Sequence, residues 1–305
     1  MNPYKKSLIY LHLGTFLCAL SGIFGKLLAL PSLIITLGRV FFSSLALLLI
    51  LLAGRKRIRL DGKKDFFSLA ALGVLLAVHW ASFYEAIQLS TVALGLLAFS
   101  TFPVFVTFLE PLFFRQKLRL ENVVIALAVF AGIAVVVPEF RLENQATKGI
   151  LLGIFSGFTY AILALCNKRF TGKYSGTQIS FYEHLFSCIA LLPFLFVYRP
   201  ALTPRDIGLL ALLGIVCTGI AQSLYVSSLR HVSARMAGIV SCLEPIYSTL
   251  FAFLFLHEAP ALRDYIGAVI ILGPWSTRHC GQTRRRSLPQ RPMPEIRLSL
   301  GGKAC

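Results

Sequence analysis

Ser43-Ser44-Leu45-Ala46-Leu47-Leu48 is repeated 144 positions later as Ser187-Cys188-Ile189-Ala190-Leu191-Leu192. Three further landmarks recur in the same order at nearly the same spacing: Gly73 as Gly214, Tyr84 as Tyr225 and Pro103 as Pro245. All of these residues lie in or beside long apolar runs. Duplication within so apolar a chain is typical of membrane transporters that are built from two related halves.

The composition indicates a membrane protein. Of the 305 residues, 56% are hydrophobic and only 14% are charged. A soluble domain cannot bury that much apolar surface, so lipid must solvate much of it. The net charge is +17, but the basic residues gather in short loops and near the C-terminus. That distribution is typical of topology signals and not of a nucleic-acid surface.

Ten apolar runs are long enough, or nearly long enough, to cross a bilayer. The first half contains the runs 7–29, 32–53, 66–89, 91–114 and 121–138, and the second half contains 149–167, 177–198, 207–229, 232–256 and 264–275. The first run is too long for a cleaved signal peptide and is expected to remain as a span. The predicted fold class is an all-α polytopic membrane protein with ten transmembrane helices, the tenth truncated or irregular.

The odd number of spans in each half predicts that the two halves lie in the membrane with opposite orientation. Before the C-terminal tail, sixteen basic residues fall on the side of the N-terminus and five on the other side. Positive charge favours the cytoplasmic side, so we expect a cytoplasmic N-terminus in a cytoplasmic (inner) membrane.

The predicted domains are a first repeat at 7–138, a second repeat at 148–275 and a basic, disordered tail at 276–305. The tenth run ends at Pro274-Trp275, and its twelve residues give about 18 Å of helix, short of a hydrocarbon core near 30 Å. Two explanations remain open at this stage. The tail is foreign to the fold, for example read from a shifted frame, or it is a natural cytoplasmic tail after a short or re-entrant helix.

Two stretches carry a resemblance to a known family. Phe99-Ser100-Thr101-Phe102-Pro103-Val104-Phe105 and Ser241-Cys242-Leu243-Glu244-Pro245-Ile246-Tyr247 are each followed by apolar turns, then by Arg115-Gln116-Lys117-Leu118 and His257-Glu258-Ala259-Pro260. The pattern resembles the EamA repeat of the drug/metabolite transporter superfamily, and Arg39 resembles an arginine often found in the first repeat. The resemblance covers about residues 8–273. It implies two inverted five-helix repeats around a substrate cavity that opens alternately to each side.

This chain departs from the repeat pattern in three places. Gln116 stands where the repeat commonly carries Glu, Pro260 follows closely after Glu258, and the tenth run is truncated.

Charged residues inside apolar runs usually face the bundle interior and mark a pathway. Arg39 and Glu183 occupy equivalent positions of the second and seventh runs, so we expect them to meet at the centre or to face a shared cavity. The alternatives are an ion pair that only joins the halves, or two charges that reach outward to the interfaces.

The third run combines aromatic residues with one carboxylate: His79, Trp80, Tyr84 and Glu85. Such a helix suits a site for a cationic or aromatic metabolite, and Tyr225, the counterpart of Tyr84, belongs to the same predicted site. The alternative for Glu85 is a solvated position near the helix end.

Pro103 and Pro245 are predicted to kink equivalent helices and to free carbonyl groups for a cavity. Glu244, beside the second kink, is therefore a candidate for substrate binding or proton coupling. Burial favours the protonated form of a carboxyl group, which makes such coupling chemically accessible.

The predicted function is a secondary active transporter, for export or exchange of a small polar or zwitterionic metabolite. Its expected partners are that substrate, protons as an option, and membrane lipids, with no nucleic acid, cofactor or metal and with monomer or homodimer both open. The alternative, a membrane-embedded enzyme or lipid-handling protein, would need a cluster of His, Asp or Glu at one leaflet. His257-Glu258-Ala259-Pro260-Ala261 lacks the second histidine of a zinc protease helix. A non-transporting scaffold or receptor is a further alternative.

Overall fold

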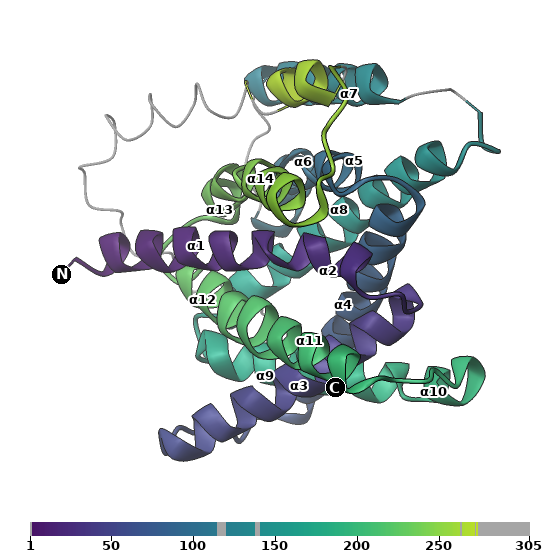
Figure 1. The fold of residues 1–305 in the computed structure, drawn as a ribbon. Helices are drawn as coiled ribbons and strands as arrows, with labels where there is room; N and C mark the ends of the chain where they lie inside the picture. Colours follow the sequence, from purple (N-terminus) through teal and green to yellow (C-terminus); the bar gives the residue numbers. More distant parts are fainter. Residues whose placement is uncertain (1, 115–119, 138–140, 263, 272, 274–305) are drawn as a thin grey trace, which may run out of the picture.

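The computed structural model describes residues 2–114, 120–137, 141–262, 264–271 and 273. Within these ranges every element of regular secondary structure is helical (Figure 1). Eight helical segments are long and apolar enough to cross a membrane. The prediction of an all-α membrane protein is therefore confirmed. The predicted tail at 276–305 and the end of the tenth run lie outside the described residues.

The first half contains four long spans and a shorter helix. The bounds are α1 (Pro3–Ala19) with α2 (Ser21–Leu27), α3 (Ser32–Ala53), α4 (Lys63–Leu89), α5 (Val92–Phe99) with α6 (Phe102–Phe114), and α7 (Leu120–Val136). Each element lies within a few residues of a predicted run. The apolar length needed to cross lipid thus determines where these helices begin and end, as the sequence predicts.

The second half repeats this order. The bounds are α8 (Gln145–Phe170), α9 (Gly176–Leu191) with α10 (Pro193–Tyr198), α11 (Pro204–Gly214) with the π-helix η1 (Ile215–Ile220) and α12 (Ala221–Ser228), and α13 (Ala234–Ser241) with α14 (Glu244–Leu256). Residues 264–271 are also helical. They lie beside α7 in Figure 1, where Gly132 and Gly267 each approach the backbone or side chains of the other helix.

Polar N-caps fix where several of these helices begin. The Thr91 hydroxyl accepts a hydrogen bond from the Leu94 backbone N–H, and the Ser233 hydroxyl accepts one from Met236. Because an N-cap satisfies an otherwise unpaired backbone donor, it defines the first turn. The two caps start α5 and α13, which are corresponding helices of the two halves.

The fourth and ninth spans are both interrupted next to a proline. The break between α5 and α6 falls at Ser100-Thr101, just before Pro103, and the break between α13 and α14 falls at Cys242-Leu243, just before Pro245. Proline has no N–H to donate and its ring clashes with the preceding turn, so a helix restarts at it more easily than it continues through it.

Two glycines allow each half to pack closely on the other. A Cβ added to Gly73 on α4 would lie 2.5 Å from Phe186 Cβ on α9, and one added to Gly214 would lie 2.7 Å from Phe42 Cβ on α3. Phe42 and Phe186 are corresponding residues of the repeat, as are the two glycines. A glycine of each half therefore packs against the corresponding phenylalanine of the other half.

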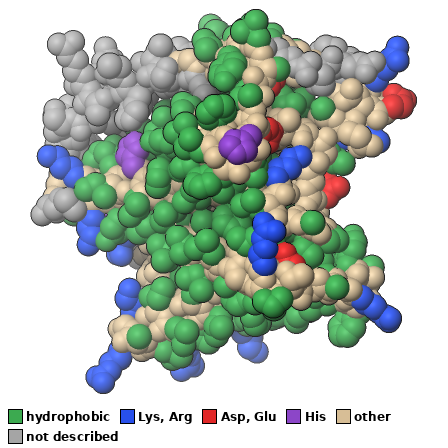
Figure 2. Space-filling model, in the orientation of Figure 1, with side chains coloured by type: hydrophobic (Ala, Val, Ile, Leu, Met, Phe, Trp, Pro, Cys, Tyr) green, Lys and Arg blue, Asp and Glu red, His purple; other side chains and the backbone are tan. Residues whose placement is uncertain are grey.

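The outer surface is apolar. Large exposed side chains include Leu49, Phe67 and Phe196, whose exposed fractions are 57%, 67% and 80%. Figure 2 shows hydrophobic side chains over much of one face. Exposed apolar surface on this scale suits contact with lipid rather than with water.

Candidate functional site

A small cavity lies at the centre of the bundle, and both halves line it. Its lining residues are Cys18, Ser21, Arg39, His79, Trp80, Phe83, Phe99, Tyr160, Cys217, Thr218, Gln222 and Glu244. The free volume is about 30 Å³, enough for one or two water molecules. The four predicted site residues Arg39, His79, Trp80 and Glu244 are among the lining residues.

Arg39 on α3 is 2% exposed and is held by neutral groups. Its Nε donates a hydrogen bond of 3.0 Å to Thr218 Oγ1, and its Nη1 donates one of 3.0 Å to the Tyr84 hydroxyl. The guanidinium carbon lies 3.9 Å from the Trp80 ring centre. Among the described residues no carboxylate forms an ion pair with it. The site therefore keeps a buried positive charge whose strongest possible partner, an anion, is not supplied by the described chain.

Thr218 reaches Arg39 from the π-helix η1. Its hydroxyl donates a hydrogen bond of 2.8 Å to the Leu213 carbonyl oxygen, five residues earlier, and accepts the bond from Arg39. Short π-helical segments occur often at functional sites. The sequence analysis did not identify Thr218. The available signal was the pair of polar residues Thr218 and Gln222, one turn apart in an apolar run.

Glu244 brings a carboxylate to the same cavity. It is the first residue of α14, where the helix dipole favours negative charge, and it is 9% exposed. Among the described residues it forms no ion pair, with Arg39 or with any other base. The cavity thus contains a guanidinium group and a carboxyl group that do not form an ion pair with each other.

Aromatic rings form much of the remaining wall. The His79 ring stacks on Tyr160 with centroids 4.8 Å apart, and Phe99 lies 5.6 Å from His79. His79 is held in place by Ser156 on α8, whose carbonyl oxygen lies 3.0 Å from Nδ1. Tyr160, which the sequence analysis did not identify, is contributed by α8. These rings offer flat apolar surface beside the two charges.

Four other predicted site residues lie outside the cavity lining. The Tyr84 hydroxyl accepts a hydrogen bond from Arg39. Tyr225 is 3% exposed, and its ring centre lies 5.7 Å from that of Tyr160. Glu85 is only half-buried, near the C-terminal end of α4. Glu183 is fully buried on α9 and accepts a hydrogen bond of 3.2 Å from Asn167 Nδ2. The structure therefore does not bring Glu183 and Arg39 together in one cavity.

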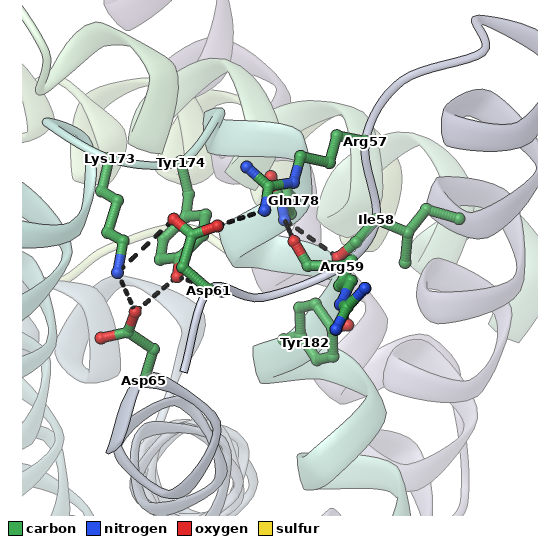
Figure 3. A network of polar contacts seen from close by, with 9 residues as sticks. All are labelled: Arg57, Ile58, Arg59, Asp61, Asp65, Lys173, Tyr174, Gln178 and Tyr182. Carbon is green, nitrogen blue, oxygen red and sulfur yellow. Dashed lines mark hydrogen bonds and ion pairs between the residues drawn. The ribbon is translucent and has the colours of Figure 1, made fainter. Parts of the chain in front are cut away.

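A polar network joins the two halves at one end of the bundle (Figure 3). Lys173 Nζ lies 2.5 Å from Asp65 Oδ2, and the Tyr174 hydroxyl donates to the same oxygen. Asp61 also pairs with Lys173 at 3.5 Å and with Arg57. The hydrogen bonds that Lys173 makes to Asp65 and Tyr174 raise the pKa of the lysine. The network ties the α3–α4 connection to the α8–α9 connection.

Further bonds from the same connection reach α9. Gln178 Nε2 donates to the Ile58 carbonyl oxygen at 2.9 Å, and the Tyr182 hydroxyl donates to the same oxygen at 3.1 Å. Two side chains of α9 thus hold the segment around Ile58 against the second half (Figure 3).

Different contacts hold the opposite end. Lys26 Nζ donates to the carbonyl oxygen of Ser90 at 2.7 Å, and the Val92 N–H donates to Glu258 Oε1 at 3.0 Å. At the same end as the Lys173 network, Lys168 donates to the carbonyl oxygens of Leu229 and Val232. Both lysines thus cover carbonyl groups at helix ends.

The described part of the chain contains no group of three or more His, Cys, Asp or Glu side chains placed to hold a metal ion. The residues that line the cavity offer charge, hydrogen-bonding groups and aromatic surface for recognition.

Comparison with known proteins gives a consistent assignment. Residues 5–137 and 147–273 each match the family described as "EamA-like transporter family". An uncharacterized transporter of Archaeoglobus fulgidus is 28% identical over 78% of this chain and 83% of its own length. The uncharacterized transporter YxxF of Bacillus subtilis is 25% identical over 82% of each chain.

Two further matches extend the comparison. An S-adenosylmethionine uptake transporter of Rickettsia bellii is 22% identical over 77% of this chain and 79% of its own length. A solved crystal structure of 18% identity aligns with 93% of this chain and 99% of its own at a TM-score of 0.70, which shows a shared fold. These matches confirm the resemblance predicted from the Phe99–Phe105 and Ser241–Tyr247 stretches, and the expectation of a transporter rather than an enzyme.

Proposed function

The chain belongs to the EamA-like transporter family, and we propose that it is a secondary active transporter of a small zwitterionic metabolite, working by export or exchange. It is a multi-pass membrane transporter for a small molecule. The finer proposal is that the substrate binds between Arg39 and Glu244. We place the protein in the cytoplasmic (inner) membrane with its N-terminus in the cytoplasm, because the positive loops lie on that side.

The observation that carries the proposal is the pair of unmatched charges in one cavity. Arg39 and Glu244 both line it and form no ion pair with each other. A buried charge is costly unless a partner of opposite sign reaches it. A zwitterion supplies both partners at once, with its carboxylate toward Arg39 and its ammonium toward Glu244. Trp80 and Tyr160 offer aromatic surface for the rest of the molecule.

The size of the cavity supports a mechanism with a closed intermediate. About 30 Å³ holds water but no metabolite, so the helices must separate before substrate enters. Interrupted helices are the elements most able to change shape, and two of them, together with η1, contribute to the cavity wall. We therefore propose alternating access, with the described conformation too narrow to hold the substrate.

Two inverted five-helix repeats, with approximate bounds 7–138 and 148–275, would supply the required symmetry. On this proposal α7 and the helix at 264–271 are the fifth and tenth transmembrane helices. The antiparallel packing of α4 on α8 supports it, because Asp65 near the start of α4 contacts Lys173 after α8, while Gly149 near the start of α8 contacts Ala86. The reciprocal contacts of Gly73 and Gly214 support it too.

The Rickettsia relative suggests a first compound to test. S-adenosylmethionine is a zwitterion that also carries a sulfonium cation and an aromatic base. The combination of Arg39, Glu244 and aromatic rings fits those groups by charge and by cation–π contact. Ordinary zwitterionic amino acids fit the two charges as well and belong in the same panel.

The test is counterflow in proteoliposomes that contain the purified full chain. Each panel compound is loaded inside, and uptake of its labelled form is measured against simple anions and simple cations of similar size. We expect zwitterions to be exchanged, and Arg39→Gln and Glu244→Gln to lower exchange about tenfold or more. Glu143→Gln, which alters an exposed loop carboxylate, is the control. Exchange of no compound by well-folded protein, or exchange by both cavity variants at the wild-type rate, would contradict the proposal.

A further inference from the structure

A second group of buried polar atoms lies on α8 and α9, away from the cavity. Asn167 Oδ1, Ser180 Oγ and Glu183 Oε1 are each buried without a hydrogen-bond partner in the described part of the chain. The three residues are at most 2% exposed. Buried polar atoms are normally paired, so these unpaired atoms on two helices that are joined at Glu183 indicate a site that the transport cavity does not use.

The three side chains are placed to act together. Asn167 Nδ2 donates to Glu183 Oε2 at 3.2 Å, which joins α8 to α9 at this point. Ser180 lies three residues before Glu183 and so shares a face of α9 with it. The only hydrogen bond that the carboxyl group receives from the described residues is therefore the one to Oε2.

This arrangement fits a neutral carboxylic acid better than a carboxylate. An ionised Glu183 would be a fully buried anion with one hydrogen bond and no ion-pair partner among the described residues. Such a charge is strongly disfavoured. A proton on the carboxyl group removes the charge, and Oε1 receives no hydrogen bond from the described residues that would stabilise the ionised form.

We propose that Glu183 is the binding site of the coupling proton, at a position separate from the substrate cavity. The inference rests on the proposed transport function and deepens it. Three oxygen atoms are too few to enclose a dehydrated metal cation, and the Asn167 amide group directs a donor at the carboxyl group. A proton needs only one donor–acceptor pair.

The groups that face α9 from neighbouring helices leave this role to Glu183. On the helices that pack against α9, the titratable or charged side chains are Arg39 of α3, Tyr198 of α10, Tyr225 of α12, and Lys63, Lys64, Asp65, His79, Tyr84 and Glu85 of α4. On α8, whose Asn167 bonds Glu183, they are Lys148, Tyr160, Cys166, Lys168 and Arg169. None of them pairs with Glu183, and the polar contacts of Arg39 go to Thr218 and Tyr84. The positive charge of the cavity is thus engaged elsewhere.

A short path of contacts connects this site to the substrate cavity. His184 follows Glu183 in the chain, and its Nδ1 lies 2.5 Å from Ser43 Oγ on α3. Its ring centre lies 5.2 Å from that of Trp80. Trp80 in turn contacts the guanidinium group of Arg39. Proton release from Glu183 in a water-exposed conformation would change the packing of α9 on both helices that hold the substrate charge.

The first test measures the proton itself and needs no substrate. Infrared difference spectra of the full chain in lipid are recorded between acidic and alkaline buffer, in H2O and in D2O. We expect a protonated-carboxyl signal at neutral pH that is lost in Glu183→Gln and retained in Glu143→Gln. Identical spectra for the wild type and Glu183→Gln would overturn the proposal.

The second test separates coupling from exchange. With a compound that shows counterflow, we expect Glu183→Gln to retain exchange but to lose accumulation driven by an imposed pH gradient. Glu183→Asp, which keeps an acid at the site, should restore accumulation with a shifted pH profile. If Glu183→Gln accumulates substrate as the wild type does, or if a sodium gradient and not a pH gradient drives the wild type, the proposal is overturned.

The two arms also distinguish this inference from the proposed function. Absence of counterflow for every compound would count against zwitterion transport, while the infrared experiment would still decide whether Glu183 holds a proton. If Glu183→Gln does not yield monodisperse protein, Glu183→Asp and Asn167→Ala provide the spectral comparison. A shifted carboxyl signal is expected in both, and unchanged signals in both would overturn the proposal.

Discussion

The guanidinium carbon of Arg39 lies 3.9 Å from the ring centre of Trp80. This contact joins α3 to α4, and the bond from Arg39 to Thr218 joins both helices to η1 of the other half. A single buried cation therefore connects three elements of the cavity wall. Its position is determined by an aromatic face on one side and a hydroxyl group on the other.

The Arg39–Trp80 contact predicts that these residues tolerate little change. Trp80→Leu removes the cation–π contact, so we expect a loss of about 1–2 kcal/mol of stability and a higher KM for substrate. Arg39→Lys keeps the charge but loses the planar group that bonds Thr218 and Tyr84 together, so exchange should fall about tenfold. Thermal unfolding in detergent and counterflow measure the two effects. Phe67→Leu, on the exposed surface, is the control, and an equal effect there would contradict a specific role for Trp80.

The two interface glycines predict a matched pair of stability effects. Gly73→Ala places a methyl group 2.5 Å from Phe186 Cβ, and Gly214→Ala places one 2.6 Å from the Arg39 carbonyl oxygen. Because backbone and Cβ atoms cannot move aside cheaply, each change should cost about 1–3 kcal/mol. Gly208→Ala is the control, since nothing lies within 4 Å of its added methyl group. There we expect a neutral or slightly stabilising effect.

Thermal unfolding of the three glycine variants provides the measurement. The repeat symmetry makes the prediction sharper, because Gly73 and Gly214 should behave alike and differently from Gly208. If Gly73→Ala and Gly208→Ala gave the same midpoint, the close packing of α4 on α9 would be in doubt.

The sequence was sufficient to predict the spans because lipid imposes a single length scale on apolar helices. The family likewise followed from local stretches around Pro103 and Pro245. These features depend on residues that are near one another in the chain.

The contacts between helices were less accessible from the sequence. Glu183 lies in register with Arg39 in the repeat, yet it bonds Asn167 and does not line the cavity. Register fixes a position along a helix but not which neighbours surround it. Thr218 was missed for a related reason, because a π-helix changes the direction of side chains relative to a regular helical period. Only three-dimensional packing reveals such residues.

Loss of the network at the α3–α4 connection is predicted to change how often this end of the bundle opens rather than the stability of the fold. Lys173 is 47% exposed, so its pairing with Asp65 should contribute little to the free energy of unfolding. Lys173→Ala should nevertheless let this end open more often, because the network bridges both halves. Modification of Cys18 and Cys217 in the cavity by a thiol reagent added from this side should become faster.

The same network predicts a defined pH response. The pKa of Lys173 is raised by its hydrogen bonds to Asp65 and Tyr174, so its contribution is complete below the usual lysine pKa of about 10.4 and is lost as pH rises through the higher value in the folded protein. The ratio of the modification rate in Lys173→Ala to that in the wild type should therefore not change between about pH 6 and about pH 9. Lys56→Ala, an exposed lysine of the same connection, is the control. Equal acceleration by both variants would point to general charge loss instead of the network.

Thr218 provides the most direct test of η1. Thr218→Val keeps the shape of the side chain but removes the acceptor for Arg39 Nε and the donor to the Leu213 carbonyl oxygen. A buried N–H of a charged group is then left unpaired, which costs about 1.5–3 kcal/mol. We expect a lower midpoint of unfolding and at least about tenfold slower exchange. Thr218→Ser, which keeps the hydroxyl group, should retain most of both properties. If the valine and serine variants behaved alike, the hydroxyl group would have no role in holding Arg39, and the site would depend on Trp80 and Tyr84 alone.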